Sequence, residues 1–501
     1  MTMLSPSPFM VSLIQVATSL PIFLFALPAG ALGDMFNRRT LLLITQLVSA
    51  AVMIVFAGLL ETGQNSVAIL LLFTFLGGTS AAFAYPAWQA IIPALIPRET
   101  LHAAITLNGV SINIARAIGP AIGGFILVSL GAMVTVMLNG LSFLIVIAAL
   151  VWWRTTQASS TTLLPREQLV GAMQAGVRFA LGSQALRYTL VRTFAFFIFA
   201  SAYWALLPLI ARVLFLGGPG FYGLLLTALG GGALLGTLWI PRLKQQLSMS
   251  QSVALGTAGT SLAMLLFACG KIAWMGIIAS TIAGVSWIVV LSALNLSAQV
   301  SLPDWVRARG MAIFQMVLFG AMTLGSLVWG QIANHFGLSQ ALIAAALCAL
   351  FSIVLIWRFT LNLDGQRDHT PSGHWSDPDT IAPMAHDSGP VLVTLEYVID
   401  DSDREQFSQL MREMGAIRRR DGAVQWGFFE KVDARGHFIE LFTVESWVAH
   451  MRQHARVSIA DKTLQDKINA LHRGQGKPHV THAVTPHPGG EIKSLPKKHY
   501  D

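Results

Sequence analysis

Long apolar runs alternate with short polar connections from the start of the chain to about Arg358. A helix needs about 20 apolar residues to cross the hydrocarbon core of a bilayer. We therefore predict eleven membrane-spanning helices, at residues 9–33, 41–60, 67–92, 102–128, 132–153, 190–214, 221–240, 252–269, 272–300, 310–333 and 339–357. This part of the chain is expected to be an all-α polytopic membrane protein.

Positive charge is concentrated in every second connection between the runs. The basic connections carry Arg38 and Arg39, Arg98, Arg154 to Arg187, Arg242 and Lys244, Arg307 and Arg309, and Arg358. The connections at 61–66 and 217–220 contain neither Lys nor Arg. Because cytoplasmic loops carry an excess of these residues, the alternation places the tail after Arg358 in the cytoplasm and the first residue outside.

A shift of the chain on itself by 206 positions reveals an internal repeat. Four successive runs align without a gap under this shift, at the pairs Gly30/Gly236, Gly78/Gly284, Gly119/Gly325 and Gly124/Gly330. The repeat predicts two transporter halves, 1–153 and 190–360, which a basic cytoplasmic linker at 154–189 joins. Two such halves can rock about a shared site at the midplane of the membrane and give alternating access.

The same shift predicts that the first half is incomplete. The run at 190–214 opens the second half, and its counterpart in the first half would precede Met1. We therefore expect the first helix of the N-terminal half to be missing.

The chain changes character after the last apolar run. Residues 361–388 form a polar linker, 389–486 follow the order strand, helix, two strands, helices and strand, and 487–501 are expected to be a disordered tail. This order predicts a C-terminal α+β domain of the ferredoxin-like type. Its sheet would carry more apolar side chains than two helices cover, which predicts a sheet-to-sheet homodimer: Val391, Val393, Leu395, Trp426, Phe428, Phe438 and Phe442.

Composition excludes an ordinary soluble fold for most of the chain. The sequence is 54% hydrophobic and 12% charged, against roughly 25% charged in soluble domains. The net charge of +8 comes mainly from arginines at helix ends, where they set orientation, so we expect no nucleic-acid partner. Cys269 and Cys348 fall inside apolar runs and indicate neither a disulfide nor a metal site.

A charged motif lies between the first two runs. Gly30, Asp34, Arg38 and Arg39 have the spacing G-x-x-x-D-x-x-x-R-R, which resembles the signature loop of the major facilitator superfamily. The resemblance implies a conformational latch, in which the glycine allows close helix approach and the acid and arginines exchange partners as the halves move. The alternative is that the two arginines only anchor the topology.

A second motif lies in the run at 102–128. The segment ARAIGPAIGG at 115–124 resembles the glycine-proline motif of superfamily antiporters, through Gly119, Pro120, Gly123 and Gly124, and implies export. Plain close packing needs the same small residues. Arg116 lies about 21 Å along this helix, which indicates either an anion or coupling contact in the translocation path or a structural pair with a group such as Asn113.

Ten neutral polar or aromatic residues in the runs are candidates for the substrate cavity or, alternatively, for bonds between helices. They are Gln15, Tyr85, Trp88, Gln89, Asn108, Asn113, Asn139, Trp287, Asn295 and Gln315. The acids Asp34, Glu61, Glu99, Glu167 and Asp304 all map to helix ends or loops. The run that starts at Val67 also lacks the arginine that many superfamily exporters carry. Both features count against the standard route of proton coupling, which stays an open alternative.

The C-terminal domain resembles the dimeric domains of the antibiotic-biosynthesis-monooxygenase type. His450 and His454 lie four residues apart on one predicted helix face, a spacing that could support a metal. The sequence offers no third ligand, so we predict no metal site, no cofactor and no catalytic residue in this domain.

Together, the two parts resemble the transmembrane secretion effector branch of the superfamily, which is related to the enterobactin exporter. The resemblance implies a multi-pass exporter of the bacterial inner membrane that carries a siderophore-like or drug-like small molecule. The residues themselves imply lipid bilayer and small-molecule partners. Two other functions stay open, a membrane-tethered monooxygenase-like enzyme and a non-transporting fragment.

Overall fold

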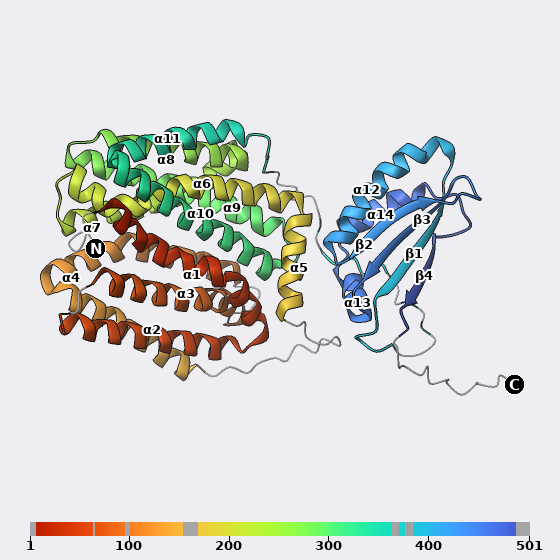
Figure 1. The fold of residues 1–501 in the computed structure, drawn as a ribbon, viewed down its shortest axis with the longest axis horizontal. Coiled ribbons are helices and arrows are strands. Elements are labelled where there is room, and N and C mark those ends of the chain that lie inside the picture. The colour runs from red at the N-terminus through yellow and green to blue at the C-terminus, as the bar shows by residue number, and fades with distance from the viewer. Residues whose placement is uncertain are drawn as a thin grey trace. The chain divides into compact units, whose positions relative to one another are not determined.

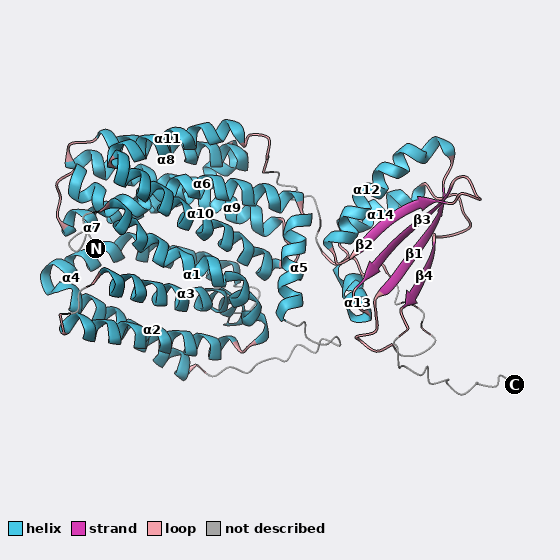
Figure 2. Cartoon of the chain, viewed as in Figure 1, coloured by secondary structure: helices cyan, strands magenta, loops and turns pink. Residues whose placement is uncertain are grey.

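A computed structural model describes residues 7–63, 66–95, 101–153, 169–361, 368, 370–375, 378, 380 and 384–486, apart from some side chains within helices. Glu99, Glu167, part of the two predicted linkers and the predicted disordered tail lie outside the described residues. The chain divides into two compact units, a helical unit and a smaller mixed unit. Each is described by itself below (Figures 1 and 2).

The helical unit is a bundle of long antiparallel helices (Figure 1). Its helices are α1 Pro8–Met35, α2 Arg38–Glu61, α3 Val67–Leu95, α4 Leu101–Trp152, α6 Gln184–Leu209, α7 Pro219–Gln246, α8 Met249–Cys269, α9 Ala273–Val300, α10 Arg307–Phe336 and α11 Leu338–Leu355. Within the described residues, ten spans are long and apolar enough to cross a membrane. The predicted run at 102–128 forms the first part of α4, so every predicted run is helical.

Local chemistry explains where these helices turn. The side chain of Asn37 accepts hydrogen bonds from the backbone N–H groups of Arg39 and Thr40 and so begins α2, as N-cap residues do. Gly131 has φ of 83°, a left-handed conformation that interrupts α4 between its two predicted runs. The bond pattern of α6 loosens after Pro208 into a π-helical turn at Ile210–Leu214.

The internal repeat is visible in how equivalent helices pack. A Cβ added at Gly78 would lie 3.0 Å from the backbone oxygen of Thr18, so α3 packs closely on α1. A Cβ at Gly284 would overlap the backbone oxygen of Leu229, so α9 packs closely on α7. The two glycines are the residues that the shift of 206 positions pairs. The same small residue therefore makes the same helix contact in both halves.

The second unit contains a four-stranded antiparallel sheet with strand order β2-β3-β1-β4. Its elements are α5 Leu169–Gly182, β1 Val391–Val398, the 3-10 turn Asp401–Asp403, α12 Arg404–Arg420, β2 Gln425–Glu430, β3 His437–Val444, α13 Trp447–Arg456, α14 Ile459–Ala470 and β4 His479–Val484. The strands and helices alternate after residue 390 in the order that the sequence predicts. Helix α5 lies in the segment that we interpreted only as a linker.

The buried apolar side chains of the sheet lie on one face. The register pairs Val393 with Phe442 and Phe442 with Trp426, so these side chains point the same way. They belong to a single core cluster that α12, α13 and α14 complete. All seven residues on which the dimer prediction rests are part of this core or pack against it. The reason given for the dimer was therefore wrong, because these side chains are covered by the helices of the same domain. A dimer would have to use the opposite face of the sheet.

Candidate functional site

The contact between α1 and α10 joins the N-terminal part of the helical unit to its C-terminal part. Contacts recur along the whole of α1, at the pairs Ser7–Asn334, Ser12–Gly330, Ser19–Thr323, Phe23–Gly320 and Gly30–Ala312. Residue numbers rise along one helix as they fall along the other, so the helices run antiparallel. We call this contact the α1–α10 seam.

The polar link at the centre of the seam is weak and reversible. The buried hydroxyls of Ser19 and Thr323 lie 2.7 Å apart. Each hydroxyl also lies within hydrogen-bond distance of a carbonyl of its own helix, Gln15 for Ser19 at 2.7 Å and Phe319 for Thr323 at 2.8 Å. Because each hydroxyl keeps an acceptor when the helices part, opening the seam strands no donor in the membrane.

Small residues let the seam close tightly. A Cβ added at Gly330 would overlap the Ser12 hydroxyl and lie 2.7 Å from its Cβ. The repeat pairs Gly330 with Gly124, where an added Cβ would lie 3.4 Å from the Cα of Gly223 on α7. Equivalent glycines therefore line two contacts between the halves, α1 with α10 and α4 with α7. This arrangement is the one expected for two bundles that move against each other.

The glycines of the glycine-proline motif lie in different environments. Gly124 makes the contact with α7, whereas Gly119 and Gly123 have no other described atom within 4 Å of an added Cβ. The side chains of Arg116 and Pro120 lie outside the described residues. The motif as a whole, and the role of Arg116, stay predictions.

The residues of the charged motif have separate structural roles. Gly30 approaches α10, where an added Cβ would lie 3.2 Å from the Cβ of Ala312. Arg39 donates from Nε to the carbonyl of Leu150 at 2.7 Å and from Nη2 to that of Val151 at 2.9 Å. It therefore caps the end of α4, where cations are favourable. Arg38 is exposed and the Asp34 side chain lies outside the described residues, so the exchange of ion pairs stays a prediction.

The cavity candidates occupy different environments. Tyr85, Trp88 and Asn139 are exposed, and Gln15, Trp287, Asn295 and Gln315 are half-buried. Trp287 joins an aromatic cluster on α6, with ring centroids 5.0 Å from Phe197 and 5.1 Å from Trp204. Asn295 accepts from Gln299 one turn further along the same helix. The side chains of Gln89, Asn108 and Asn113 lie outside the described residues.

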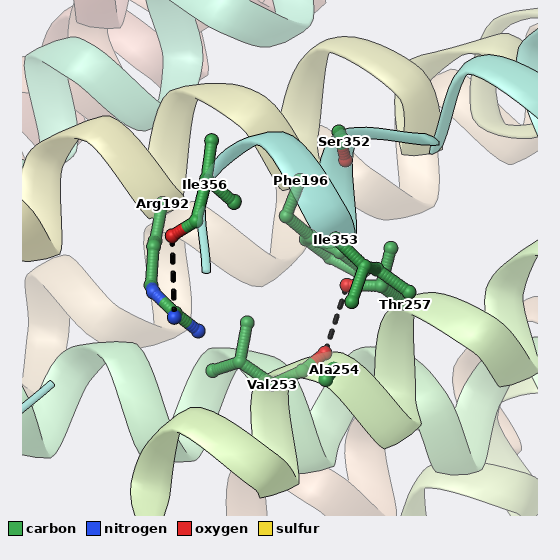
Figure 3. A pocket seen from close by; sticks show the side chains of 8 residues that line it. All are labelled: Arg192, Phe196, Val253, Ala254, Thr257, Ser352, Ile353 and Ile356. Carbon is green, nitrogen blue, oxygen red and sulfur yellow. Dashed lines mark hydrogen bonds between the residues drawn. The ribbon is translucent and has the colours of Figure 1, made fainter. Parts of the chain in front are cut away.

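The predicted candidates do not line the pocket drawn in Figure 3. That pocket lies between α6, α8 and α11, and the chemistry at its wall comes from Arg192. The guanidinium donates from Nε to the carbonyl of Phe359 at 2.6 Å, from Nη1 to Ser250 at 3.3 Å and from Nη2 to Ile356 at 3.4 Å. One buried cation therefore satisfies carbonyls at the end of α11 and the start of α8.

Sequence reasoning missed Arg192, although a signal was present. It is an arginine two turns inside an apolar helix, and such a residue needs either a cavity or several acceptors. The structure supplies backbone acceptors, so Arg192 fastens one end of the C-terminal half.

The mixed unit has a buried polar network of its own. Arg418 donates to Glu440 at 3.0 Å with both side chains buried, and Tyr397 and Trp426 donate to the same carboxylate at 3.2 and 3.0 Å. Burial lowers the pKa of the Arg418 guanidinium, but the Glu440 carboxylate outweighs burial and raises that pKa above its usual value. The sequence signal was an acid at an inward position of a strand, between Phe438 and Phe442.

Helix α5 and the short segment at 302–307 belong to this mixed unit and pack against its C-terminal residues. The Arg456 guanidinium lies 4.1 Å from the ring centroid of Trp305, and Trp305 meets Phe179 of α5 edge to face at 5.7 Å. Arg178 of α5 pairs with Glu445 at 3.2 Å. The linker between the halves and the connection between α9 and α10 therefore both contact the C-terminal domain.

Comparison with known proteins identifies a family and several relatives of this chain. The family described as transmembrane secretion effector matches residues 1–488. The chain is 24% identical over 323 residues to the staphyloferrin A transporter of Staphylococcus aureus, covering 64% of this chain and 79% of that protein. It is 25% identical over 361 residues to the multidrug efflux pump Tap of Mycolicibacterium fortuitum, covering 67% and 83%. It is 26% identical over 368 residues to the enterobactin exporter EntS of Salmonella choleraesuis, covering 73% and 86%.

Solved structures support the fold of the helical unit. The fucose:proton symporter of E. coli aligns with a TM-score of 0.51 at 16% identity, over 71% of this chain and 92% of that one. The human organic anion transporter MFSD10 aligns with a TM-score of 0.52 at 17% identity, over 69% and 83%. At these identities the likeness establishes the fold alone.

The seam predicts a specific steric rescue. Gly330→Val is expected to lower the free energy of unfolding by about 1–3 kcal/mol, because the new side chain overlaps Ser12. The double variant Gly330→Val with Ser12→Gly should recover most of this loss, and Gly119→Val is the control with open space. Thermal unfolding in detergent measures all three. A Gly330→Val protein as stable as the parent, or one that Ser12→Gly does not rescue, contradicts the seam.

Arg192 is expected to stabilise the C-terminal half. Arg192→Met should cost about 2 kcal/mol, because carbonyls that now accept charged hydrogen bonds lose their donor. Arg187→Met, at an exposed position near the start of the same helix, is the matched control. Equal melting temperatures for the two variants would show that the guanidinium does not fasten α11 and α8.

Proposed function

Since this chain belongs to the transmembrane secretion effector family of the major facilitator superfamily, we propose that it exports a small amphipathic molecule from the bacterial cytoplasm. The family match and the fold confirm the resemblance that the sequence motifs carry. The protein is a multi-pass membrane transporter, and its partners are the lipid bilayer and a small-molecule substrate. The bacterial inner membrane is the location consistent with its family and relatives.

A siderophore-like or drug-like substrate is the class that the relatives support. Three relatives are a staphyloferrin A transporter, a multidrug efflux pump and an enterobactin exporter. The half-buried candidates Gln15, Trp287 and Gln315 are neutral polar or aromatic. Such groups bind an amphipathic molecule by ring packing and a few hydrogen bonds.

The α1–α10 seam carries the proposal of alternating access. Its central link is a single pair of hydroxyls with acceptors in their own helices, Ser19 and Thr323. The halves can therefore separate on one side of the membrane and close on the other without leaving a buried donor unpaired. Gly124 supports an equivalent movement at the contact between α4 and α7.

We place the basic connections and the C-terminal domain in the cytoplasm. The positive-inside rule supports this orientation. The bonds from Arg39 to the last carbonyls of α4 agree with it, because they hold two basic connections at the same end of the bundle.

We propose that transport is coupled to protons, and the carboxylates available for this coupling in the helical unit lie at helix ends. The sequence of each helix in the helical unit contains no carboxylate between its end turns. Asp34 and Glu61 lie in the last turns of α1 and α2. Asp34 belongs to the charged motif, so we propose that it exchanges partners among helix ends during the transport cycle.

Inside-out membrane vesicles test export and the latch together. Energised vesicles that contain the protein should accumulate a catecholate siderophore or ethidium above vesicles without it. Asp34→Asn should lower the maximal velocity by at least about tenfold at unchanged KM, because the latch acts in cycling and not in binding. Asp401→Asn, in an exposed turn of the C-terminal domain, is the control.

Two results would contradict the proposal. Failure to accumulate either probe opposes export of this substrate class and favours a tethered enzyme or a non-transporting protein. Accumulation at an unchanged velocity in Asp34→Asn keeps export but removes the latch.

We also propose that the C-terminal domain forms a homodimer through the open face of its sheet. This face carries Leu392, Ile439 and Leu441, together with the exposed Phe429. None of these four side chains belongs to the core cluster that the helices cover.

Leu441→Glu is expected to convert the dimer of the full-length protein to a monomer, because the new carboxylate would be buried without a partner. Val432→Glu adds the same charge to an exposed turn and should leave the dimer intact. Light scattering of the detergent-solubilised chains measures the mass. A monomeric parent protein, or equal masses for both variants, would rule out this interface.

A further inference from the structure

Three histidines from two separate elements meet in the C-terminal domain. His450 and His454 lie one turn apart on α13, and His482 lies on the edge strand β4. One ring nitrogen of each lies within 4.8 Å of one ring nitrogen of the other two. We propose that these three imidazoles bind one divalent transition-metal ion of the zinc class, a function that goes beyond transport.

The spacing of the nitrogens suits one shared ion. Two nitrogens that bind a tetrahedral Zn²⁺ at about 2.1 Å lie roughly 3.4 Å from each other. The Nε2 atoms of His450 and His454 already lie 3.2 Å apart. Rotation of the His482 ring toward them completes a three-histidine set. Three protein nitrogens leave a fourth position for water, the arrangement of open zinc sites.

The surroundings favour the neutral form of His450 and His482. Burial is the largest cause that lowers the pKa of His450 to about 3, and the neighbouring His454 and His482 act in the same direction. Burial also lowers the pKa of His482. The Arg418 guanidinium also lowers the pKa of His450, and it is paired with Glu440. Neutral imidazole is the form that binds metals.

Unsatisfied polar atoms mark the same place. Within the described residues, Nδ1 of His450 and both amide atoms of Gln453 are buried without a hydrogen-bond partner. Buried polar side chains are nearly always bonded to protein or ordered water. Gln453 lies one turn from His450 on α13, where its amide can hold a water on the ion or orient the His450 ring.

Ring packing alone accounts for only part of this arrangement. Trp447 packs against His450 and His482 at 5.8 and 6.4 Å, and Trp375 packs against His454 at 4.9 Å. These contacts explain why the rings are held in place. They leave Nδ1 of His450 and the amide of Gln453 without a partner. With Nε2 of His450 on the ion, Nδ1 would carry the proton and could donate it to the Gln453 amide oxygen, as the outer partners of metal-binding histidines do.

The full-length protein in detergent tests the site directly. It should be purified without a histidine tag, stripped with a chelator and titrated with Zn²⁺ by calorimetry and with Co²⁺ by visible absorption. We expect one ion per chain, ligand-field bands of a four- or five-coordinate Co²⁺, and a higher melting temperature with Zn²⁺.

His482→Gln should weaken Zn²⁺ binding by about 100-fold or more, because even the loss of an outer-shell partner costs roughly 10–100-fold. His479→Gln changes an exposed histidine of the same strand that pairs with Glu396 and should leave binding unchanged. The melting temperature of the metal-free variants checks their folding, and His454→Gln replaces His482→Gln if the latter unfolds.

Two outcomes overturn the site. One is an absence of stoichiometric Zn²⁺ or Co²⁺ binding by the parent protein. The other is equal affinity in a folded ligand variant and in His479→Gln. Neither depends on whether the protein transports any molecule.

Discussion

The close approach of helices at small residues is the constraint on which this molecule depends. Lipid tails are as apolar as leucine side chains, so burial of apolar surface does not choose which helices pair in a membrane. Packing and a few hydrogen bonds choose instead. Gly78 and Gly284 fix the same helix pair in each half, and Gly330 and Gly124 fix the contacts between the halves. One kind of residue therefore builds each half and also defines the surfaces on which the halves meet.

The bonds within a half and the bonds between halves differ in strength. Arg192 holds α8 and α11 together through several charged hydrogen bonds from one buried guanidinium. At the seam, Ser19 and Thr323 share a neutral contact that each hydroxyl can replace within its own helix. A charged hydrogen bond is worth roughly twice a neutral one. The distribution of these bonds thus favours rigid halves with a separable boundary, as movement of whole bundles requires.

Periodic features of the fold were predictable from the sequence, and contacts between distant residues were not. Apolar runs gave the helices, the shift of 206 positions gave the repeat, and alternation gave the strands. Helix α5 was missed because it is a short amphipathic segment between two long apolar runs, and we interpreted its basic residues as those of a linker. His482 was missed as a neighbour of His450 because β4 returns beside α13 only after the sheet forms. The acceptors of Arg192 come from other helices, and no local pattern encodes them.

The C-terminal domain contacts two segments that connect parts of the transporter in the chain. Helix α5 belongs to the linker between the halves, and Trp305 belongs to the connection that leads into α10. Both pack on the domain through Phe179, Arg178 and Arg456. The held segment at 302–307 is continuous in the chain with α10, which forms one side of the seam. A dimer contact or a bound ion in the domain can shift the transport cycle only if its affinity differs between two states of the transporter.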